Sequence, residues 1–131
     1  MLFRSVVKVC QIHLPKICGE VKANNNVKTY WGDAFESIKK VKDSKYDKIF
    51  VDLNDDQYCI DLAAKNMKGL KRILKPGGVI TAQVGCLSKK PRQVNNWLKI
   101  LSQNFGNSKL DEVFIPSFDC RWNFASSTMN S

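Results

Sequence analysis

The sequence predicts an α/β protein, the second part of a doubly wound sheet that ends in an antiparallel hairpin. The first observation is that strand-like apolar runs over residues 48–52 and 79–84 alternate with segments of helical periodicity. The second is that two further strand-like runs, residues 110–115 and 121–126, are joined by a short turn that contains Pro116. A length of 131 residues suffices for one domain with a real core, but it is small for an enzyme with two substrates.

Two elements are expected near the N-terminus. The helical spacing of apolar side chains predicts a helix over residues 2–14, which Pro15 ends. Residues 20–26 contain three consecutive Asn and are predicted to form a polar loop. The alternation of apolar and polar side chains that follows predicts a short strand over residues 27–31, which stops at Gly32.

Asp33 stands where the next helix begins, and two roles suit it. Glu36 follows three residues later, which is the spacing of a capping box. Asp is a favoured N-cap residue in any helix, so capping alone explains its presence. The same carboxylate could instead accept hydrogen bonds from the amino group of a ligand at the edge of the sheet. Both roles need a carboxylate, so the sequence leaves both open.

The stretch YDKIFVDLNDD, residues 46–56, carries the acidic groups on which a functional interpretation depends. It begins as a strand with apolar residues on both sides of Asp52, and it breaks into Asn54, Asp55 and Asp56. In open α/β sheets, ligands bind in the crevice outside the carboxyl ends of the strands. The sequence therefore predicts an acidic crevice here. The alternative is a solvated polar loop, which is common after a strand.

The second half of the chain is predicted to alternate regularly between helices and strands. Helical spacing predicts helices over residues 57–74 and 90–105, and Lys75-Pro76-Gly77-Gly78 is expected to end the first of them and turn the chain. The strand over residues 79–84 is nearly all small or apolar, which is typical of a strand inside a sheet. Gln83 lies at its end, next to the predicted crevice.

Charge and hydropathy exclude several classes of partner. The formal net charge of +9 and the pI near 9.4 would suit an anionic partner. However, the lysines are spread over the whole chain with only short runs such as Lys39-Lys40, and no groove-reading motif or aromatic-rich RNA-binding signature accompanies them. We therefore expect solvated lysine faces and no nucleic-acid partner. No apolar run reaches about 18 residues, so we expect no membrane partner.

The N-terminus and the cysteines indicate a cytoplasmic protein. The first ten residues are interrupted by Lys8 and lack a small-residue cleavage site, so they do not resemble a signal peptide. The five cysteines are odd in number, far apart and without a C-x-x-C pair. We expect them to be free thiols of a reducing compartment, and we expect no metal site, because only His13 could join them.

Five sequence runs together resemble a known family. They are VVKVCQIHLPKICG, WGDAFESI, YDKIFVDLNDD, LKPGGVITAQ and FIPSFDCRWNFASS. In order and spacing they are similar to the C-terminal half of the spermidine synthase family, over about residues 6–128. LKPGG before a strand is shared by many folds, whereas the D-x-x-D after the strand together with the I-P-S-F turn is more specific. The resemblance implies that residues 1–131 form a single partial aminopropyltransferase-like domain. Its sheet would be an incomplete doubly wound one, Rossmann-like and class I methyltransferase-like.

The resemblance also implies roles for four carboxylate-bearing or neighbouring positions. Asp33, with Ala34 beside it, matches the position on the adenine side of decarboxylated S-adenosylmethionine, which would be a co-substrate; no bound cofactor is expected. Asp52 matches the residue that orients and helps deprotonate the attacking amine, and Asp55 matches the residue that holds the charged end of that amine. A diamine is cationic at neutral pH, so paired carboxylates at a strand end suit it physically.

Two further positions line the site by the same resemblance, and several departures accompany them. Gln83 matches a site-lining glutamine, and Phe118 stands where the family commonly has Tyr, which removes a hydroxyl that could bond an amine. The residues after Asp55 lack the family's turn rich in Pro and Gly. The glycine-rich nucleotide loop, the acidic residue for the donor's ribose and the β-rich N-terminal domain have no counterpart in this chain.

The expected function is therefore a spermidine synthase-like transfer of an aminopropyl group to putrescine or a similar diamine, in a chain that is expected to be weakly active or inactive alone. The alternative is a non-catalytic partner that associates with a full-length synthase, and a methyltransferase comes third. In the family, the strand equivalent to residues 27–31 lies beyond two strands that this chain does not contain. An unpaired edge invites association, so we expect a homo-oligomer or a partner chain.

Overall fold

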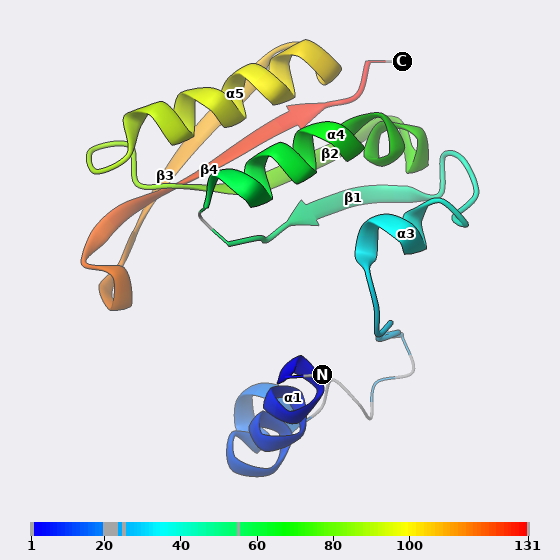
Figure 1. The fold of residues 1–131 in the computed structure, drawn as a ribbon, viewed down its shortest axis with the longest axis vertical. Helices are drawn as coiled ribbons and strands as arrows, with labels where there is room; N and C mark the ends of the chain where they lie inside the picture. The colour runs from blue at the N-terminus through cyan, green and yellow to red at the C-terminus, as the bar shows by residue number, and fades with distance from the viewer. Residues whose placement is uncertain (1, 20–23, 25, 55, 131) are drawn as a thin grey trace. The chain divides into compact units, whose positions relative to one another are not determined.

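The computed structural model describes residues 2–19, 24, 26–54 and 56–130 (Figure 1). The chain divides into two units, Met1–Glu36 and Ser37–Ser131, each of which is described by itself. The first unit contains two helical segments and the start of a third. The second unit contains a sheet of four strands and the two long helices that cover it.

The first unit begins with helix α1, which spans Leu2–His13 and confirms the helix predicted over residues 2–14. A short π-helical segment, η1, follows at Pro15–Gly19. The unit ends in the first turn of α3, Ala34–Ile38. Of the polar loop predicted over residues 20–26, residues 20–23 and 25 lie outside the part that the structure describes.

The strand predicted over residues 27–31 is wrong. The structure assigns no strand to this segment, and all five of its side chains are exposed. A strand is stable only when its backbone N–H and C=O groups have a neighbouring strand to bond with. Among the described residues, the four strands of the sheet all lie in the second unit.

The second unit is organised by a sheet whose strands lie in the order β1-β2-β4-β3. The strands are β1 (Tyr46–Val51), β2 (Leu74–Gly85), β3 (Ser108–Ile115) and β4 (Cys120–Thr128). β1 and β2 pair in parallel, whereas β4 is antiparallel to both β2 and β3. The predicted α/β architecture with a C-terminal antiparallel hairpin is thus confirmed.

Helices α4 (Gln57–Ile73) and α5 (Pro91–Phe105) cover one face of this sheet (Figure 1). Both match the predicted helices to within a residue at each end. Alternate residues of β2 face them and are buried, namely Ile80, Ala82 and Val84. The helices contribute a regularly spaced apolar face, which consists of Ile60, Ala63, Met67, Leu70, Ile73, Val94, Trp97, Leu101 and Phe105. The core of the second unit therefore lies on this face.

The Lys75-Pro76-Gly77-Gly78 segment differs from its predicted role as a turn between two elements. In the structure β2 begins at Leu74 and includes the whole segment, with a register shift against β1 between Tyr46 and Lys48. Gly77 has φ +72, which an L side chain rarely adopts. Its N–H donates to the carbonyl of Met129, and the Met129 N–H donates to the carbonyl of Gly78. This pairing with the C-terminal end of the chain extends the sheet through the turn.

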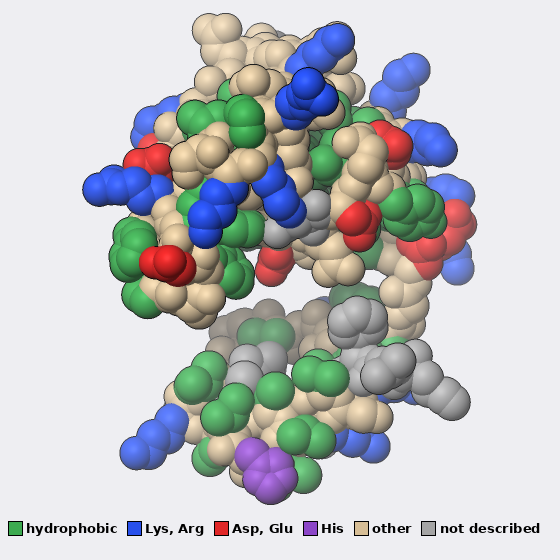
Figure 2. Space-filling view, turned by 60° about the vertical axis from the view of Figure 1, so that its left-hand side comes forward, with side chains coloured by type: hydrophobic (Ala, Val, Ile, Leu, Met, Phe, Trp, Pro, Cys, Tyr) green, Lys and Arg blue, Asp and Glu red, His purple; other side chains and the backbone are tan. Residues whose placement is uncertain are grey.

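On the face shown in Figure 2, Lys and Arg side chains are interspersed with acidic and apolar ones. This distribution is the one expected of solvated lysines. No helix among the described residues is long and apolar enough to cross a membrane. In the same residues there is no group of three or more His, Cys, Asp or Glu side chains that could hold a metal ion.

Candidate functional site

A cavity of about 390 Å³ lies at the carboxyl ends of β1 and β2, on the face of the sheet opposite α4 and α5. The side chains on this face alternate with the buried ones, so Thr81 and Gln83 of β2 are only half-buried. Cross-strand neighbours share the face: Phe50 lies opposite Thr81, and Phe124 lies opposite Gln83. The lining residues are Phe50, Val51, Asp52, Thr81, Gln83, Ile115, Phe118, Trp122 and Phe124.

Asp52 supplies the acidic group of this cavity. It follows β1 directly, and its neighbour Val51 is buried, so the strand end fixes where its exposed side chain emerges. This is the position that the crevice prediction gave it. Asp55, the second predicted carboxylate, lies outside the described residues. Asp56 is used structurally, since its Oδ1 accepts a hydrogen bond from the Cys59 N–H at 2.8 Å and caps α4.

Aromatic rings form much of the remaining wall. Phe118 and Trp122 stack with ring centroids 4.4 Å apart at 44°, and both line the cavity. Phe50 is 74% exposed and Phe118 is 50% exposed, so apolar ring surface faces the solvent around the carboxylate. Alkyl chains pack on such rings, and the ring faces attract ammonium groups. The cavity therefore suits a ligand with an apolar chain and a cationic end.

Gln83 connects the wall of the cavity to the end of β1. Its Nε2 donates to the carbonyl of Leu53 at 2.5 Å, and its Oε1 accepts from the indole Nε1 of Trp122 at 2.7 Å. Leu53 is the residue after Asp52, so Gln83 holds the main chain that carries the carboxylate. The structure thus places Gln83 in the wall of the cavity, with both ends of its amide bonded to the protein, and its role toward a substrate stays a prediction.

Trp122 is a site residue that the sequence analysis missed. Its signal is the alternation in Cys120-Arg-Trp-Asn-Phe124, which places Trp122 and Phe124 on the same face of a strand. The alternation alone does not show that this face is free of helices and open to a ligand. That depends on the position of β4 in the sheet, which the sequence pattern does not give. Phe50 and Ile115 were missed for the same reason.

Asp33 and Ala34 belong to the first unit and are both exposed. Asp33 Oδ1 accepts hydrogen bonds from the N–H groups of Phe35 at 2.7 Å and Glu36 at 3.2 Å. The capping role that the sequence left open is therefore present at the start of α3. One carboxylate oxygen of Asp33 thus bonds to the protein backbone, and the role of this residue toward the adenine of a ligand remains a prediction.

Comparison with known proteins identifies the family. Residues 3–131 match the family model of the spermine/spermidine synthase domain. The chain belongs to this family. It is 30% identical to the polyamine aminopropyltransferase of Prochlorococcus marinus strain MIT 9215, over 93% of this chain and 45% of the relative. The enzyme of the same name from strain MIT 9301 matches with the same identity and coverage. The chain thus spans less than half the length of these curated relatives.

Solved structures show the same fold. The crystal structure of spermidine synthase from Thermotoga maritima matches with a TM-score of 0.76 and 15% identity, over 92% of this chain and 41% of that one. A spermidine synthase in complex with the transition state analogue AdoDATO matches with a TM-score of 0.78 and 15% identity, over 92% and 42%. The Rossmann-like, methyltransferase-like fold expected from the family resemblance is thereby confirmed.

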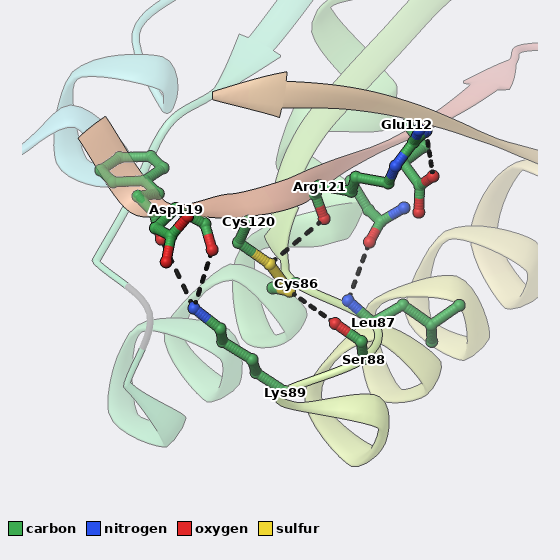
Figure 3. Close-up of a disulfide and its surroundings, with 10 residues drawn as sticks. Cys86, Leu87, Ser88, Lys89, Glu112, Asp119, Cys120 and Arg121 are labelled. Atoms are coloured by element: carbon green, nitrogen blue, oxygen red, sulfur yellow. Dashed lines mark hydrogen bonds and ion pairs between the residues drawn. A yellow bond between two sulfur atoms is a disulfide. The ribbon is translucent and has the colours of Figure 1, made fainter. Parts of the chain in front are cut away.

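The cysteines of this family member correct one prediction. Cys86 and Cys120 form a disulfide, although all five cysteines were expected to be free thiols (Figure 3). Their separation of 34 residues in sequence hides the fact that the end of β2 and the start of β4 are neighbours in the sheet. Cys10 and Cys59 are free. The expected cytoplasmic location loses one of its supports, because persistent disulfides are rare in reducing compartments.

Cys59, in the first turn of α4, has a thiol pKa raised above its ordinary value. Burial raises it most, and the hydrogen bond to the Asp56 carboxylate and its negative charge raise it further. Because the thiolate is the nucleophile, we expect Asp56→Asn to increase the rate at which iodoacetamide alkylates Cys59 at neutral pH. Asn retains N-cap ability, so the helix should remain. Peptide mass mapping of alkylated protein measures the rate.

Asp61→Asn is the matched control, because it removes a carboxylate from α4 whose oxygen accepts from Gln57 Nε2 and which does not act on Cys59. Its alkylation rate should equal that of the unmodified chain. Equal rates in the two Asn variants would show that the Asp56 charge does not control this thiol.

Proposed function

We propose that this chain carries the acceptor side of an aminopropyltransferase site, which transfers an aminopropyl group from decarboxylated S-adenosylmethionine to putrescine or a similar diamine. Family membership supports the reaction class. The observation that carries the proposal for this chain is the position of Asp52, at the edge of a cavity walled by aromatic rings. A diamine needs such a combination, since its methylene chain is apolar and its ends are cationic.

In the proposed reaction the acceptor must present an unprotonated nitrogen. The Asp52 carboxylate hydrogen-bonds to this amino group and takes its proton, directly or through water. The nitrogen then attacks the methylene carbon next to the donor's sulfonium; a C–N bond forms, the C–S bond breaks, and its electron pair stays on sulfur as a thioether. Such a displacement depends mainly on the relative position of the reacting atoms. Gln83 contributes by holding the main chain beside Asp52, and the ring of Phe118 by packing on the methylene chain.

The donor side of the proposal rests on other residues. Asp33 and Ala34 would contact the adenine of the donor. On the acceptor side, Asp55 would hold the far ammonium group of the diamine. Because no glycine-rich nucleotide loop is among the residues of this chain, we propose that it does not turn over alone. A cytoplasmic site of action belongs to the same proposal.

A second candidate is a non-catalytic chain that binds a copy of itself or a full-length synthase. Within the described residues β1 has a strand neighbour on one side only, so its other edge presents backbone groups for pairing. Phe50, at this edge strand, is largely exposed. Size-exclusion chromatography tests the candidate: we expect an oligomer, and a monomer at all concentrations would contradict it.

Replacing Asp52 tests the acceptor site directly. We expect Asp52→Asn to weaken putrescine binding by roughly 10–100-fold, because it removes one charge-assisted hydrogen bond. Isothermal titration calorimetry with putrescine measures the effect. Asp47→Asn is the matched control: it removes the same charge from the other end of β1, where Asp47 accepts from Lys75 Nζ at 2.8 Å. Equal affinity in the Asp52 and Asp47 variants would contradict the assigned role.

A separate titration tests the donor side. The ligand is the thioether product of decarboxylated S-adenosylmethionine, which carries the adenosine part without the reactive sulfonium. Clear binding that is lost in Asp33→Ala would support the donor role of this carboxylate. Asp33→Asn should keep the helix cap and separates loss of the charge from loss of α3. No heat at millimolar concentrations would contradict an autonomous donor site.

A further inference from the structure

The disulfide between Cys86 and Cys120 joins the loop after β2 to the first residue of β4 (Figure 3). The two Cα atoms are 6.5 Å apart, within the usual range for a disulfide. Gly85, with φ +97, directs the chain away from β2 just before Cys86, and a Cβ there would meet Gln93 Nε2 at 2.7 Å. The proposed transfer reaction does not use this bond.

The disulfide lies next to the cavity wall on both strands. Gln83 lies in β2, three residues before Cys86. Phe118 and Trp122 lie two residues before and two residues after Cys120, and all three residues line the cavity. Phe118 is in the short 3₁₀ turn η2, Pro116–Phe118, which leads through Asp119 into β4. Asp119 has φ +44, the left-handed conformation, which Asp adopts more readily than most other non-glycine residues. Contacts with a neighbouring loop add to the local preference of this turn, which carries Phe118.

Those contacts come from the loop that carries Cys86. Lys89 Nζ donates to the carbonyl of Asp119 at 3.1 Å and to that of Phe118 at 3.5 Å (Figure 3). The Leu87 N–H donates at 2.8 Å to Oδ1 of the buried Asn123 in β4. The disulfide is the covalent member of this set. It fixes the base of η2 to a loop that is itself anchored on β4.

Each sulfur atom of the pair has a polar group beside it. Ser88 Oγ lies 3.1 Å from Cys86 Sγ, and the carbonyl oxygen of Arg121 lies 3.5 Å from Cys120 Sγ. After reduction the Cys120 thiol can donate to the Arg121 carbonyl and the Cys86 thiol can bond to Ser88 Oγ, so the reduced state leaves neither thiol without a polar partner. Cys86 is 2% and Cys120 6% exposed, so a reductant reaches the sulfurs only when the surrounding chain moves.

We propose that the Cys86–Cys120 pair is a redox site that clamps η2, and with it Phe118, at the cavity, and that a dithiol reductant releases the turn. A thiolate of the dithiol attacks Cys120 Sγ, the S–S bond breaks, and its electron pair goes to Cys86 Sγ, which takes a proton beside Ser88. The second thiol of the reductant then displaces Cys120 as a thiol and closes the reductant's own disulfide. Two electrons and two protons pass to the protein.

Hydrogen exchange and alkylation of the native chain test the clamp, with dithiothreitol as the dithiol. Before reduction, Cys86 and Cys120 should resist iodoacetamide while Cys10 and Cys59 react. After reduction both should be alkylated, and peptides covering residues 114–124 should lose more protection than those of α4. A Cys10→Ser, Cys59→Ser variant should respond in the same way, because neither cysteine belongs to the pair.

Three outcomes would overturn the proposal. Alkylation of Cys86 and Cys120 before any reductant is added would show that the bond is not formed. Complete reduction without faster exchange over residues 114–124 would show that the bond does not hold the turn. An equal loss of protection over residues 114–124 and over α4 would show that the bond stabilises the entire fold and not this turn in particular. None of these readouts requires a ligand or a variant that fails to fold.

The consequence for the cavity rests on the proposed function and is measured separately. We expect putrescine to bind several-fold more weakly to the reduced chain than to the oxidised chain, because Phe118 no longer packs against it. Equal affinity in both states would contradict the effect of the clamp on the cavity. If putrescine binds to neither the oxidised nor the reduced chain, the proposed function is contradicted. The redox site is then judged by the hydrogen-exchange result, which does not depend on putrescine.

Discussion

Ile80→Ala is expected to lower the free energy of unfolding of the second unit by roughly 2–5 kcal/mol. Ile80 is 0% exposed and lies in the middle of β2, with Ile49 and Ser127 as its strand neighbours. Its side chain faces α4 and α5, so truncation leaves a cavity in the apolar core between the sheet and the helices. A small domain has about 5–15 kcal/mol of stability in total, so the variant should lose a large share of it.

Urea denaturation followed by circular dichroism measures this change, and Val79→Ala is the matched control. Val79 is the preceding residue of the same strand and also β-branched, but its side chain is on the half-buried face. Both changes therefore lower strand propensity alike, and only Ile80→Ala opens a cavity under the helices. A larger loss in Val79→Ala would mean that the principal core lies on the other face of the sheet.

The sequence predicted the elements whose signals are local. The helix predicted over residues 57–74 is confirmed as α4, Gln57–Ile73. Its signals are the apolar spacing within the segment and the residues that adjoin its two ends, and all of these are close together in the sequence. The segment over residues 27–31 has the same alternation as a strand but no partner strand among the described residues, and pairing is not a local property. At Gly77 the local signal was correct and the distant one was missed. The residue has the turn conformation that its sequence predicted, but its pairing with Met129 places it inside a strand.

The candidate site divides in the same way. Asp52, Gln83 and Phe118 were predicted from the strand ends and the family resemblance, and the structure places all three in the wall of one cavity. Trp122 and the partner of Cys86 were missed. Both depend on β4 lying beside β2, an adjacency between residues far apart in sequence. A search for cysteines at the ends of strands expected to be neighbours could have found the second.

Reducing the Cys86–Cys120 disulfide is expected to lower the free energy of unfolding by about 3–4 kcal/mol, as loop-closure entropy predicts for a link between residues this far apart. The link encloses α5 and β3, which therefore sample fewer conformations in the unfolded chain while it is intact. Comparing urea midpoints of the wild-type chain with and without dithiothreitol measures the change. Reduction is preferable to Cys→Ala variants here because it removes no core atoms.

This stability effect acts through the unfolded chain, whereas the clamp on η2 acts within the folded state, so the two need not change together. The loop-closure effect requires only that the bond exists. If reduction leaves the urea midpoint unchanged, then either the unfolded chain is already compact or the bond strains the fold. Release of η2 requires in addition that Lys89 and Asn123 cannot hold the turn alone. Lys89→Met removes the hydrogen bonds to η2 and leaves the disulfide. Reduction should increase exchange over residues 114–124 more in this variant than in the wild type, because the sulfur bond is then the principal restraint on the turn.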